Sequence, residues 1–443
     1  MQIPSSPIRP LLKKLITRGL TAVDARTAVD RAITMNGDQL IVGRHRYDLS
    51  RYERVVVVGA GKAAAPMARA VEQRLGRWLD NGFVVVKHGH AIPTKRIEIA
   101  EASHPVPDRS GQRGTAKLCA MVGELSRRDL LIVLLSGGAS SLLPAPVAGI
   151  TLADKQRTTT KLLRCGATIQ EMNTVRKHLS RIKGGRLAEL TQATVATLIL
   201  SDVLGDDLSS IASGPTVPDQ TTYQDAVAIL KRYRIWTATP QRVRQYLTRG
   251  CQGLEIETPK PGSSLFRRVQ HHIVGNNAAA VAAVTRAARE AGLRTFVPTV
   301  AVTGEASEAG RQFGAMAREM ICEGKPLQRP CCVVAGGETT VTVTGNGTGG
   351  RAQEFAAAAA LEIAGLAKVW VVAIGTDGTD GPTDAAGAVV DGDTLALAQR
   401  LSVDLNRALN RHNTYPALKK LKQLIITGPT GTNVNDLYLL LLL

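Results

Sequence analysis

Continuous apolar runs alternate with helix-like segments in the first half of the chain. Helical periodicity between these runs predicts helices at Ala63–Leu79 and at about Gly111–Leu125. Strands that lack polar alternation and are separated by helices are typical of a parallel sheet covered on both faces. The runs that predict such strands are Val55–Val58, Phe83–Lys87, Leu130–Leu135 and Thr194–Leu200.

The second half of the chain has a different pattern. Thr339–Thr344 alternates Thr with Val, which predicts a half-exposed strand and therefore a mixed second sheet. The run Leu439–Leu443 predicts a buried strand end, and Leu11–Ile16 predicts an amphipathic N-terminal helix. Further strands are expected at Cys331–Ala335 and Val369–Ile374, and further helices at Ala278–Ala291, Ser307–Cys322 and Ala352–Ala364.

Two domains are expected for a chain of 443 residues, because one compact core rarely exceeds about 250–300 residues. The segment Thr258–Ser264 is the best candidate for a linker, since its two prolines and its glycine stop regular structure. These boundaries predict an N-terminal α/β domain at 1–258 and a C-terminal α/β domain at 265–443.

The formal net charge is +18, and it is concentrated in the first 250 residues, where 37 Lys and Arg face 20 Asp and Glu. A solvated surface and a field that attracts an anionic ligand both fit this excess. The basic residues are dispersed and lack an aromatic or zinc-finger pattern, which argues against binding to nucleic acid.

Six cysteines without C-x-x-C spacing predict a reduced, cytoplasmic protein. No apolar stretch reaches the ~18 residues of a membrane span, so no membrane association is expected.

Two basic residues stand at glycine-rich helix starts. Gly59-Ala60-Gly61-Lys62 follows a predicted strand, and a lysine in the first helical turn opposes the helix dipole unless an anion binds there. Arg351 after Gly345–Gly350 repeats this placement. A solvated lysine and a flexible hairpin tip are the alternatives. Because one of these cations lies in each predicted domain, we expect Lys62 and Arg351 to form two walls of a single anion site.

Ser136-Gly137-Gly138-Ala139-Ser140-Ser141 follows the third predicted strand of the first half. It offers hydroxyls and backbone amides at the carboxyl end of a sheet, where open α/β folds bind ligands. A tight turn without a ligand is the alternative. The loop is not a nucleophile elbow, because Gly-x-Ser-x-Gly is absent.

Two acidic loops suit a hard cation such as Mg²⁺, which is held by a few carboxylates, waters and substrate phosphates. The first is Ser201–Asp207, where capping of a following helix by Asp206 or Asp207 is the alternative. The second is Gly375–Asp384, whose spacing does not match an EF-hand. Glycine cradles, two cations and acid clusters together match phosphoryl transfer.

Nine motifs, in order along nearly the whole chain, resemble the class II glycerate kinases, which combine DUF4147 and MOFRL domains. They include Val-Val-Gly-Ala-Gly-Lys-Ala, Leu-Ser-Gly-Gly-Ala-Ser-Ser and Gly-Gly-Arg-Ala-Gln-Glu. The motifs lie at Val57–Ala63, Ser103–Asp108, Leu135–Ser141, Leu200–Asp206, Ala212–Thr216, Gly336–Val343, Gly349–Glu354, Gly375–Gly387 and Gly431–Leu437.

The resemblance implies a cytoplasmic enzyme that transfers the γ-phosphoryl of ATP to D-glycerate, typically giving 2-phosphoglycerate, with Mg²⁺ or another divalent cation. It implies a Rossmann-like α/β/α domain and a smaller mixed domain that enclose a cleft. The family's lysine and arginine fall on Lys62 and Arg351, which we expect to meet the transferred phosphoryl group and the glycerate carboxylate, in either assignment. Regiochemistry and oligomeric state stay open, with a homodimer as one option.

Asp202 completes the expected catalytic set, and Asp202, Asp377 and Asp380 are the candidate metal ligands, with the identity of the base left open. The expected ATP- and substrate-binding residues are Gly59, Gly61, His104, Ser136, Gly137, Gly138, Ser140, Asn277, Glu338, Thr376, Asp377 and Asp380.

Two other functions compete with the kinase. A hydroxypyruvate reductase needs a nicotinamide site, but Ala64 stands where the third fingerprint glycine belongs, and Lys87 and His88 stand where an acid is expected. Because of Lys87, NADP is still compatible with this alternative. A non-catalytic sensor of sugar acids or nucleotides would bind without turnover.

Overall fold

The computed structural model describes residues 1–443 and divides the chain into two compact units. Unit 1 contains Met1–Asp24 and Gly275–Leu443, and unit 2 contains Ala25–Val274. Within unit 1, helix α1 (Arg9–Ala22) packs against α11 (Asn277–Glu290).

Unit 2 is built on a six-stranded sheet in the order β6-β5-β4-β7-β8-β9. The pairings β4 with β5, β4 with β7, β5 with β6, and β7 with β8 are all parallel. The strand order reverses between β4 and β7, which makes the carboxyl ends of these two strands the switch point of the sheet. The strands are β4 (Arg54–Ala60), β5 (Asn81–Lys87), β6 (Ile97–Ala102), β7 (Asp129–Leu135), β8 (Thr194–Leu200) and β9 (Val269–Gly275).

Both faces of this sheet are covered, as the continuous apolar runs require. On one face, Leu118 and Val122 of α4 pack with Val56 and Val58 of β4, while the alternate residue Val57 is equally buried. The helices of the sheet layers are α2 (Ala25–Ala32), α3 (Ala64–Leu75), α4 (Arg109–Gly123), α5 (Ala139–Leu142) and α8 (Arg186–Glu189). A small sheet is formed by β1 (Ile33–Asn36), β2 (Gln39–Val42) and β3 (His45–Asp48).

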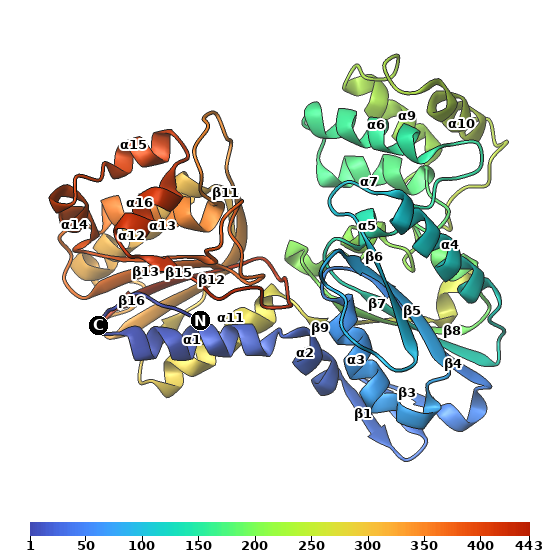
Figure 1. The fold of residues 1–443 in the computed structure, drawn as a ribbon, viewed down its shortest axis with the longest axis horizontal. Coiled ribbons are helices and arrows are strands. Elements are labelled where there is room, and N and C mark those ends of the chain that lie inside the picture. Colours follow the sequence, from blue (N-terminus) through green and yellow to red (C-terminus); the bar gives the residue numbers. More distant parts are fainter. The chain divides into compact units, whose positions relative to one another are not determined.

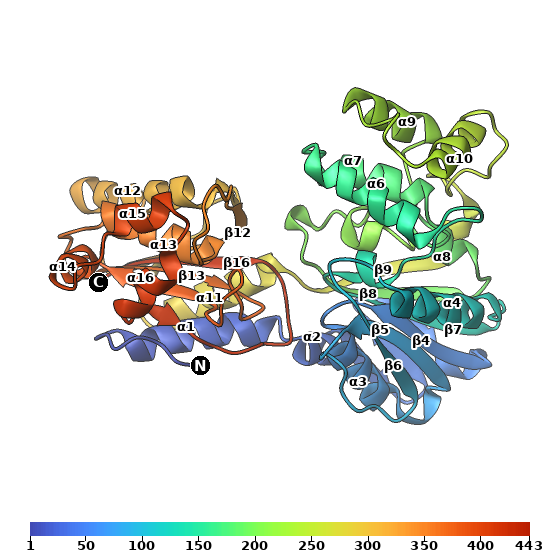
Figure 2. The same ribbon diagram turned by 45° about the horizontal axis from the view of Figure 1, so that its top comes forward.

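Four further helices form a helical lobe of unit 2 (Figures 1 and 2). Their own apolar core includes Leu162, Val175, Leu230 and Leu247. The helices of the lobe are α6 (Leu152–Arg164), α7 (Ile169–His178), α9 (Tyr223–Arg232) and α10 (Gln241–Cys251).

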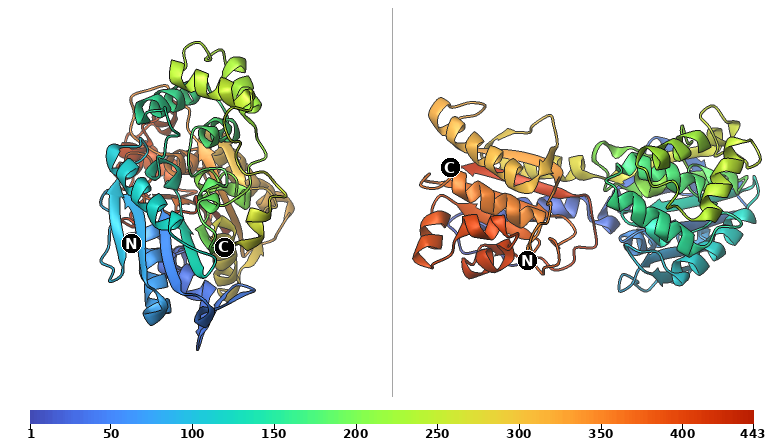
Figure 3. Two further views of the ribbon diagram at one scale, coloured as in Figure 1. Left: turned by 90° about the vertical axis from the view of Figure 1, so that its right-hand side faces the viewer. Right: turned by 90° about the horizontal axis from the view of Figure 1, so that it is seen from above.

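Unit 1 contains a mixed sheet in which the leucine-rich C-terminal strand β16 (Asp436–Leu442) lies between β12 (Cys331–Thr340) and β13 (Val369–Gly375), antiparallel to both. Helices α12 and α13 cover one face, and α1 and α11 cover the other (Figures 1 and 3). The remaining elements are β10 (Arg294–Phe296), β11 (Val302–Glu305), α12 (Ala306–Glu323), α13 (Arg351–Glu362), β14 (Gly387–Asp391), α14 (Thr394–Arg400), α15 (Leu405–Asn410), α16 (Thr414–Lys420) and β15 (Leu424–Ile425).

The predicted fold class is confirmed, since unit 2 has the parallel sheet and unit 1 the mixed one. Some elements differ from their prediction. The expected strands at Cys331–Ala335 and Thr339–Thr344 form one strand that ends at Thr340, because Gly336 and Gly337 continue the pairing with β16. Strand β6 was not predicted.

The division into units differs from the predicted boundaries 1–258 and 265–443. Gly19 of α1 allows a close approach to Val284 of α11, which places the N-terminal helix in unit 1. The segment expected to be a linker is followed by β9, which completes the sheet of unit 2.

Two whole-chain features bear on function. No helix is long and apolar enough to cross a membrane. All six cysteines are free thiols, and Cys331 and Cys332 lie buried in β12 as expected.

Candidate functional site

The loops after β4 and β7 touch at the switch point of unit 2. A Cβ atom at Gly59 would collide with the carbonyl of Leu134, and one at Gly61 would collide with Ser136. Gly61 also has a φ of +136°, which side chains rarely adopt. The two glycines therefore permit the close approach of two strand ends.

The amides of the first loop are already used within the protein. Gly61 N–H donates to Val85 (3.2 Å), Lys62 N–H to the carbonyl of Gly137 (2.8 Å), and Ala63 N–H to the buried Ser136 hydroxyl (3.0 Å). The amide cradle expected at Gly59–Lys62 is thus closed by protein groups. Helix α3 begins at Ala64, so Lys62 precedes its first turn, and the ammonium of Lys62 makes no hydrogen bond or ion pair.

The second loop presents its donors differently. The backbone amides of Gly137, Gly138 and Ser140 donate to no protein group. Gly138 has a φ of +85°, and a Cβ atom there would lie 2.8 Å from the His104 ring. Burial, together with the charge of Lys62, lowers the pKa of His104 to about 4, so its imidazole is neutral at pH 7.

A pocket of about 200 Å³ opens beside this loop, entirely within unit 2. It includes the predicted residues His104, Gly138 and Ser140, together with three cations that were not predicted as site residues. The cations are Lys155 of α6, Arg176 of α7 and Lys183, which precedes α8. No acidic side chain lines the pocket.

The two lysines of this pocket are held in low-polarity surroundings. Lys183 Nζ donates to the carbonyl (2.7 Å) and the hydroxyl (3.0 Å) of Ser140, whereas the buried Lys155 Nζ has no partner. Burial and the charge of Arg176 lower the pKa of Lys155 to about 7. Burial and the neighbouring cations also hold the pKa of Lys183 well below its usual value. The protein supplies these ammonium groups with no counter-charge.

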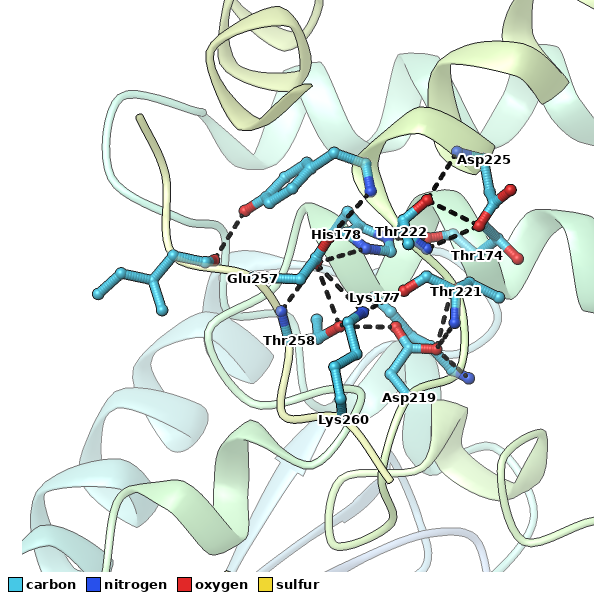
Figure 4. A network of polar contacts seen from close by, with 12 residues as sticks. Thr174, Lys177, His178, Asp219, Thr221, Thr222, Asp225, Glu257, Thr258 and Lys260 are labelled. Carbon is cyan, nitrogen blue, oxygen red and sulfur yellow. Dashed lines mark hydrogen bonds and ion pairs between the residues drawn. The ribbon is translucent and has the colours of Figure 1, made fainter. Parts of the chain in front are cut away.

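Arg176 lies on α7 just before Lys177 and His178, whose side chains belong to a polar network at the end of this helix. Figure 4 shows this network. Lys177 Nζ lies 3.3 Å from Asp219. His178 Nε2 lies 2.9 Å from Glu257. The network therefore anchors the end of α7 directly after the pocket residue Arg176.

The α-helix that follows the acidic loop after β8 is α9, and its N-cap is Thr222. Asp207 instead accepts hydrogen bonds from Ser209 and Ser210 within the loop. Asp202 lies directly beyond β8, at the same edge of the sheet as the loops after β4 and β7.

In unit 1, Arg351 is paired with two carboxylates. Its Nε lies 2.7 Å from Asp436 Oδ2, its Nη2 donates to Asp436 Oδ1 (3.0 Å), and its Nη1 donates to Glu338. Asp436 is 1% exposed, and burial raises its pKa to about 7 against the opposing pull of Arg351. The unfavourable helix-start position of Arg351 is therefore offset by acids of the protein itself. Asp436 was not predicted as a site residue.

The predicted metal ligands of unit 1 have other partners. Asp380 is 3% exposed and caps α13, accepting from the amides of Ala352 (3.1 Å) and Gln353 (2.8 Å) with separate oxygens. Asp377 Oδ1 accepts from the amide and the hydroxyl of Thr379. No group of three or more His, Cys, Asp or Glu side chains in residues 1–443 could hold a metal. These residues do not form a preformed metal cage.

Two further predicted residues hold the chain next to Arg351. Asn277 Nδ2 donates to the carbonyls of Val434 and Asp436, both at 2.9 Å. Thr376 Oγ1 donates to the carbonyl of Asn435 (2.7 Å). Both side chains thus fix the segment that presents Asp436.

Known proteins resemble the chain along its whole length. Residues 11–248 match a family described as a domain of unknown function (DUF4147), and residues 331–436 match the MOFRL family. A protein named glycerate 2-kinase from Pyrococcus horikoshii is 41% identical over 97% of this chain and 96% of its own. A protein from Agrobacterium vitis, provisionally named a hydroxypyruvate reductase, is 45% identical over 88% and 87%. The crystal structure of a glycerate kinase from Thermotoga maritima superposes with a TM-score of 0.87 at 40% identity, covering 98% of this chain and 99% of the other.

Proposed function

Because the chain belongs to the glycerate kinase family, we propose that it transfers the γ-phosphoryl group of ATP to D-glycerate, giving 2-phosphoglycerate and ADP. The observation that carries this proposal is the end-to-end similarity to a glycerate 2-kinase, which covers 97% of this chain. The free cysteines and the need for ATP favour a cytoplasmic reaction.

Lys62 is the proposed catalytic cation. Phosphoryl transfer is accelerated mainly by positioning and by positive charge near the migrating group. Lys62 stands at the switch point of the parallel sheet, and its ammonium has no partner in the protein. The free amides of the adjacent Gly137–Ser140 loop are the proposed donors to phosphate or carboxylate oxygens.

Arg351 is the second proposed functional cation. Its guanidinium is fixed in orientation by Asp436 and Glu338, which makes it a preorganised donor rather than a mobile charge. A lysine keeps the positive charge but loses the two-pronged geometry. We therefore expect Arg351→Lys to keep only a small fraction of the activity.

A divalent cation would neutralise the phosphates of ATP in this reaction. Mg²⁺ usually keeps several waters and takes one or two carboxylates along with substrate phosphates, so a preformed cage is not required. Asp202, at the carboxyl edge of the unit 2 sheet, is the proposed protein ligand. Asp380 is assigned to capping α13 instead.

The test is ADP release in the presence of D-glycerate, ATP and Mg²⁺, measured for the wild type and for Lys62→Ala. Losing one preorganised charge should lower kcat/KM by about 10²-fold or more. Lys117→Ala is the control, since Lys117 is an exposed lysine of α4 whose ammonium contacts Glu98 and the ring of Phe83 and which is not among the pocket residues described above. Wild-type kcat/KM in Lys62→Ala would remove Lys62 from the mechanism.

A further inference from the structure

Three cationic side chains from three separate segments converge on the pocket of unit 2. Lys155 comes from α6, Arg176 from α7, and Lys183 from the turn before α8. Lys155 is 8% exposed and Lys183 is 3% exposed. Because basic side chains normally reach solvent or an acidic partner, their convergence here needs a physical reason.

Burial without a counter-charge destabilises this arrangement in the free protein. Moving an ammonium group out of water costs several kcal/mol unless it is paired and hydrogen-bonded. The Lys155 Nζ has neither kind of partner, and no acid lines the pocket. An anionic ligand would reverse the sign of this electrostatic term.

The remaining lining completes an oxyanion site. The loop at the pocket's edge carries the free amides of Gly138 and Ser140, which are suited to carboxylate or phosphate oxygens. The neutral His104 ring and the Ser141 hydroxyl offer hydrogen bonds to hydroxyl groups. Residues that carry free amides, hydroxyls and cations therefore line one small volume.

The size of the pocket selects among anions. Pockets for drug-sized ligands have volumes of roughly 300–1,000 Å³. The pocket measures about 200 Å³ and has prolines and Leu152 as its apolar walls, with no aromatic ring other than the His104 imidazole. These dimensions suit a three-carbon acid better than a nucleotide.

We propose that this pocket is the acceptor subsite, in which the carboxylate of a small hydroxy acid binds to Lys155 and Arg176, with Lys183 and Ser140 as its floor. This inference rests on the proposed function and names the residues that recognise its acid substrate. It assigns a binding role to three cations that come from segments other than the Lys62 turn.

The experiment is calorimetric titration of the full chain, without nucleotide, in the wild type, Lys155→Met and Arg176→Met. D-glycerate should bind the wild type, and each variant should bind it at least tenfold more weakly. Glycerol, which lacks the carboxylate, should not bind. Arg157→Met is the matched control, because Arg157 is exposed on the same helix.

ADP distinguishes a phosphate group of the nucleotide from the carboxylate of the acid as the anion that the pocket binds. ADP affinity should change less than twofold in both variants. A loss of ADP affinity with D-glycerate binding intact would identify the pocket as a phosphate subsite of the nucleotide and overturn the proposal. Unchanged D-glycerate affinity in Lys155→Met would also overturn it, as would an equal loss in the control.

Turnover measurements separate this inference from the proposed function. A protein that binds D-glycerate through Lys155 yet releases no ADP would retain the subsite and refute the kinase. A protein that turns over with an unchanged KM for D-glycerate in Lys155→Met would retain the kinase and refute the subsite. An increased KM for D-glycerate with an unchanged KM for ATP is the expected result.

Discussion

Lys155→Met should stabilise the protein while weakening its binding of D-glycerate. Methionine is an unbranched side chain of similar length to lysine, and it suits the buried stripe of α6 that contains Lys155, Thr158 and Leu162. In the free wild type, burial and Arg176 lower the pKa of Lys155 from 10.5 to about 7. The folded state thus binds the lysine proton less tightly than the unfolded chain does.

The magnitude follows from this pKa difference. One pKa unit corresponds to about 1.4 kcal/mol, so a lowering of about 3.5 units destabilises the folded state by about 4 kcal/mol at pH 7. This value is an upper bound on the gain, because methionine does not reproduce the packing of the lysine side chain in full. We expect Lys155→Met to raise the free energy of unfolding by about 1–4 kcal/mol at pH 7.

The sign of the pH dependence is also fixed. A lysine with a lowered folded-state pKa destabilises fully below about pH 7, and this effect fades as the pH rises towards 10.5. The other titratable and charged groups that face the pocket are Arg176, Lys183 and His104. The stability difference between variant and wild type should therefore shrink between pH 7 and pH 10.

Urea unfolding at pH 6, 8 and 10, without ligand, measures this difference. Arg157→Met again serves as the control and should change stability by less than about 0.5 kcal/mol. A Lys155→Met protein that is less stable than the wild type at pH 7 would contradict the reasoning. So would a stability gain that does not vary with pH.

Three further outcomes are expected. Glu257→Gln should lower the free energy of unfolding at pH 7 by about 1 kcal/mol, after allowance for the one-third exposure of Glu257. The His178 contact and the backbone hydrogen bond from Thr258 hold the pKa of Glu257 at about 2, so the difference should vanish as the pH falls from 4.5 towards 2. Urea unfolding at pH 7 and pH 3 checks this. Asp380→Ala should lower the free energy of unfolding by about 1–2 kcal/mol, and with it the melting temperature, through the lost cap of α13. It should leave the Mg²⁺ concentration for half-maximal activity unchanged, and a shift in that concentration would restore Asp380 as a metal ligand. Hydroxypyruvate with NADH or NADPH should give no absorbance change at the nicotinamide band, because the amides of the Lys62 turn are taken by protein groups; nicotinamide oxidation would favour a reductase.

The strands that form sheet interiors could be predicted from the sequence because each is a continuous apolar run. Thr194–Leu200 was located to the residue, and the leucine run at the C-terminus is a central strand of unit 1. Strand β6 was missed because Ile97–Ala102 contains two glutamates at a sheet edge. The predicted boundary at 265 separates β9 from the sheet of unit 2, because the prolines before it indicated a linker and strand pairing is not encoded locally.

The buried cations were missed for a different reason. The segment that contains Lys155, Arg176 and Lys183 is dense in lysine and arginine. Such a composition is typical of a solvated surface, since most lysines and arginines are exposed. A signal was nevertheless present, because Lys155 continues the buried stripe of Thr158 and Leu162 at spacings of three and four residues. Arg176 likewise lies four residues after the buried Met172. Basic residues on an apolar helix stripe would have pointed to the pocket.

The partners of Arg351 could not be read from the sequence at all. Asp436 lies 85 residues further along the chain and reaches Arg351 only through the pairing of β16 with β12 and β13. A helix-start arginine indicates a nearby anion, but long-range strand pairing decides whether that anion is a ligand or a carboxylate of the protein.

The most direct measurement follows the phosphorus atoms. ³¹P NMR of D-glycerate, ATP and Mg²⁺ should show a 2-phosphoglycerate resonance growing with ADP for the wild type and for Lys117→Ala. With Lys62→Ala, the same resonance should grow about 100-fold more slowly. Absence of any new phosphoester with the wild type, or equal rates in the wild type and Lys62→Ala, would contradict a phosphoryl transfer that depends on Lys62.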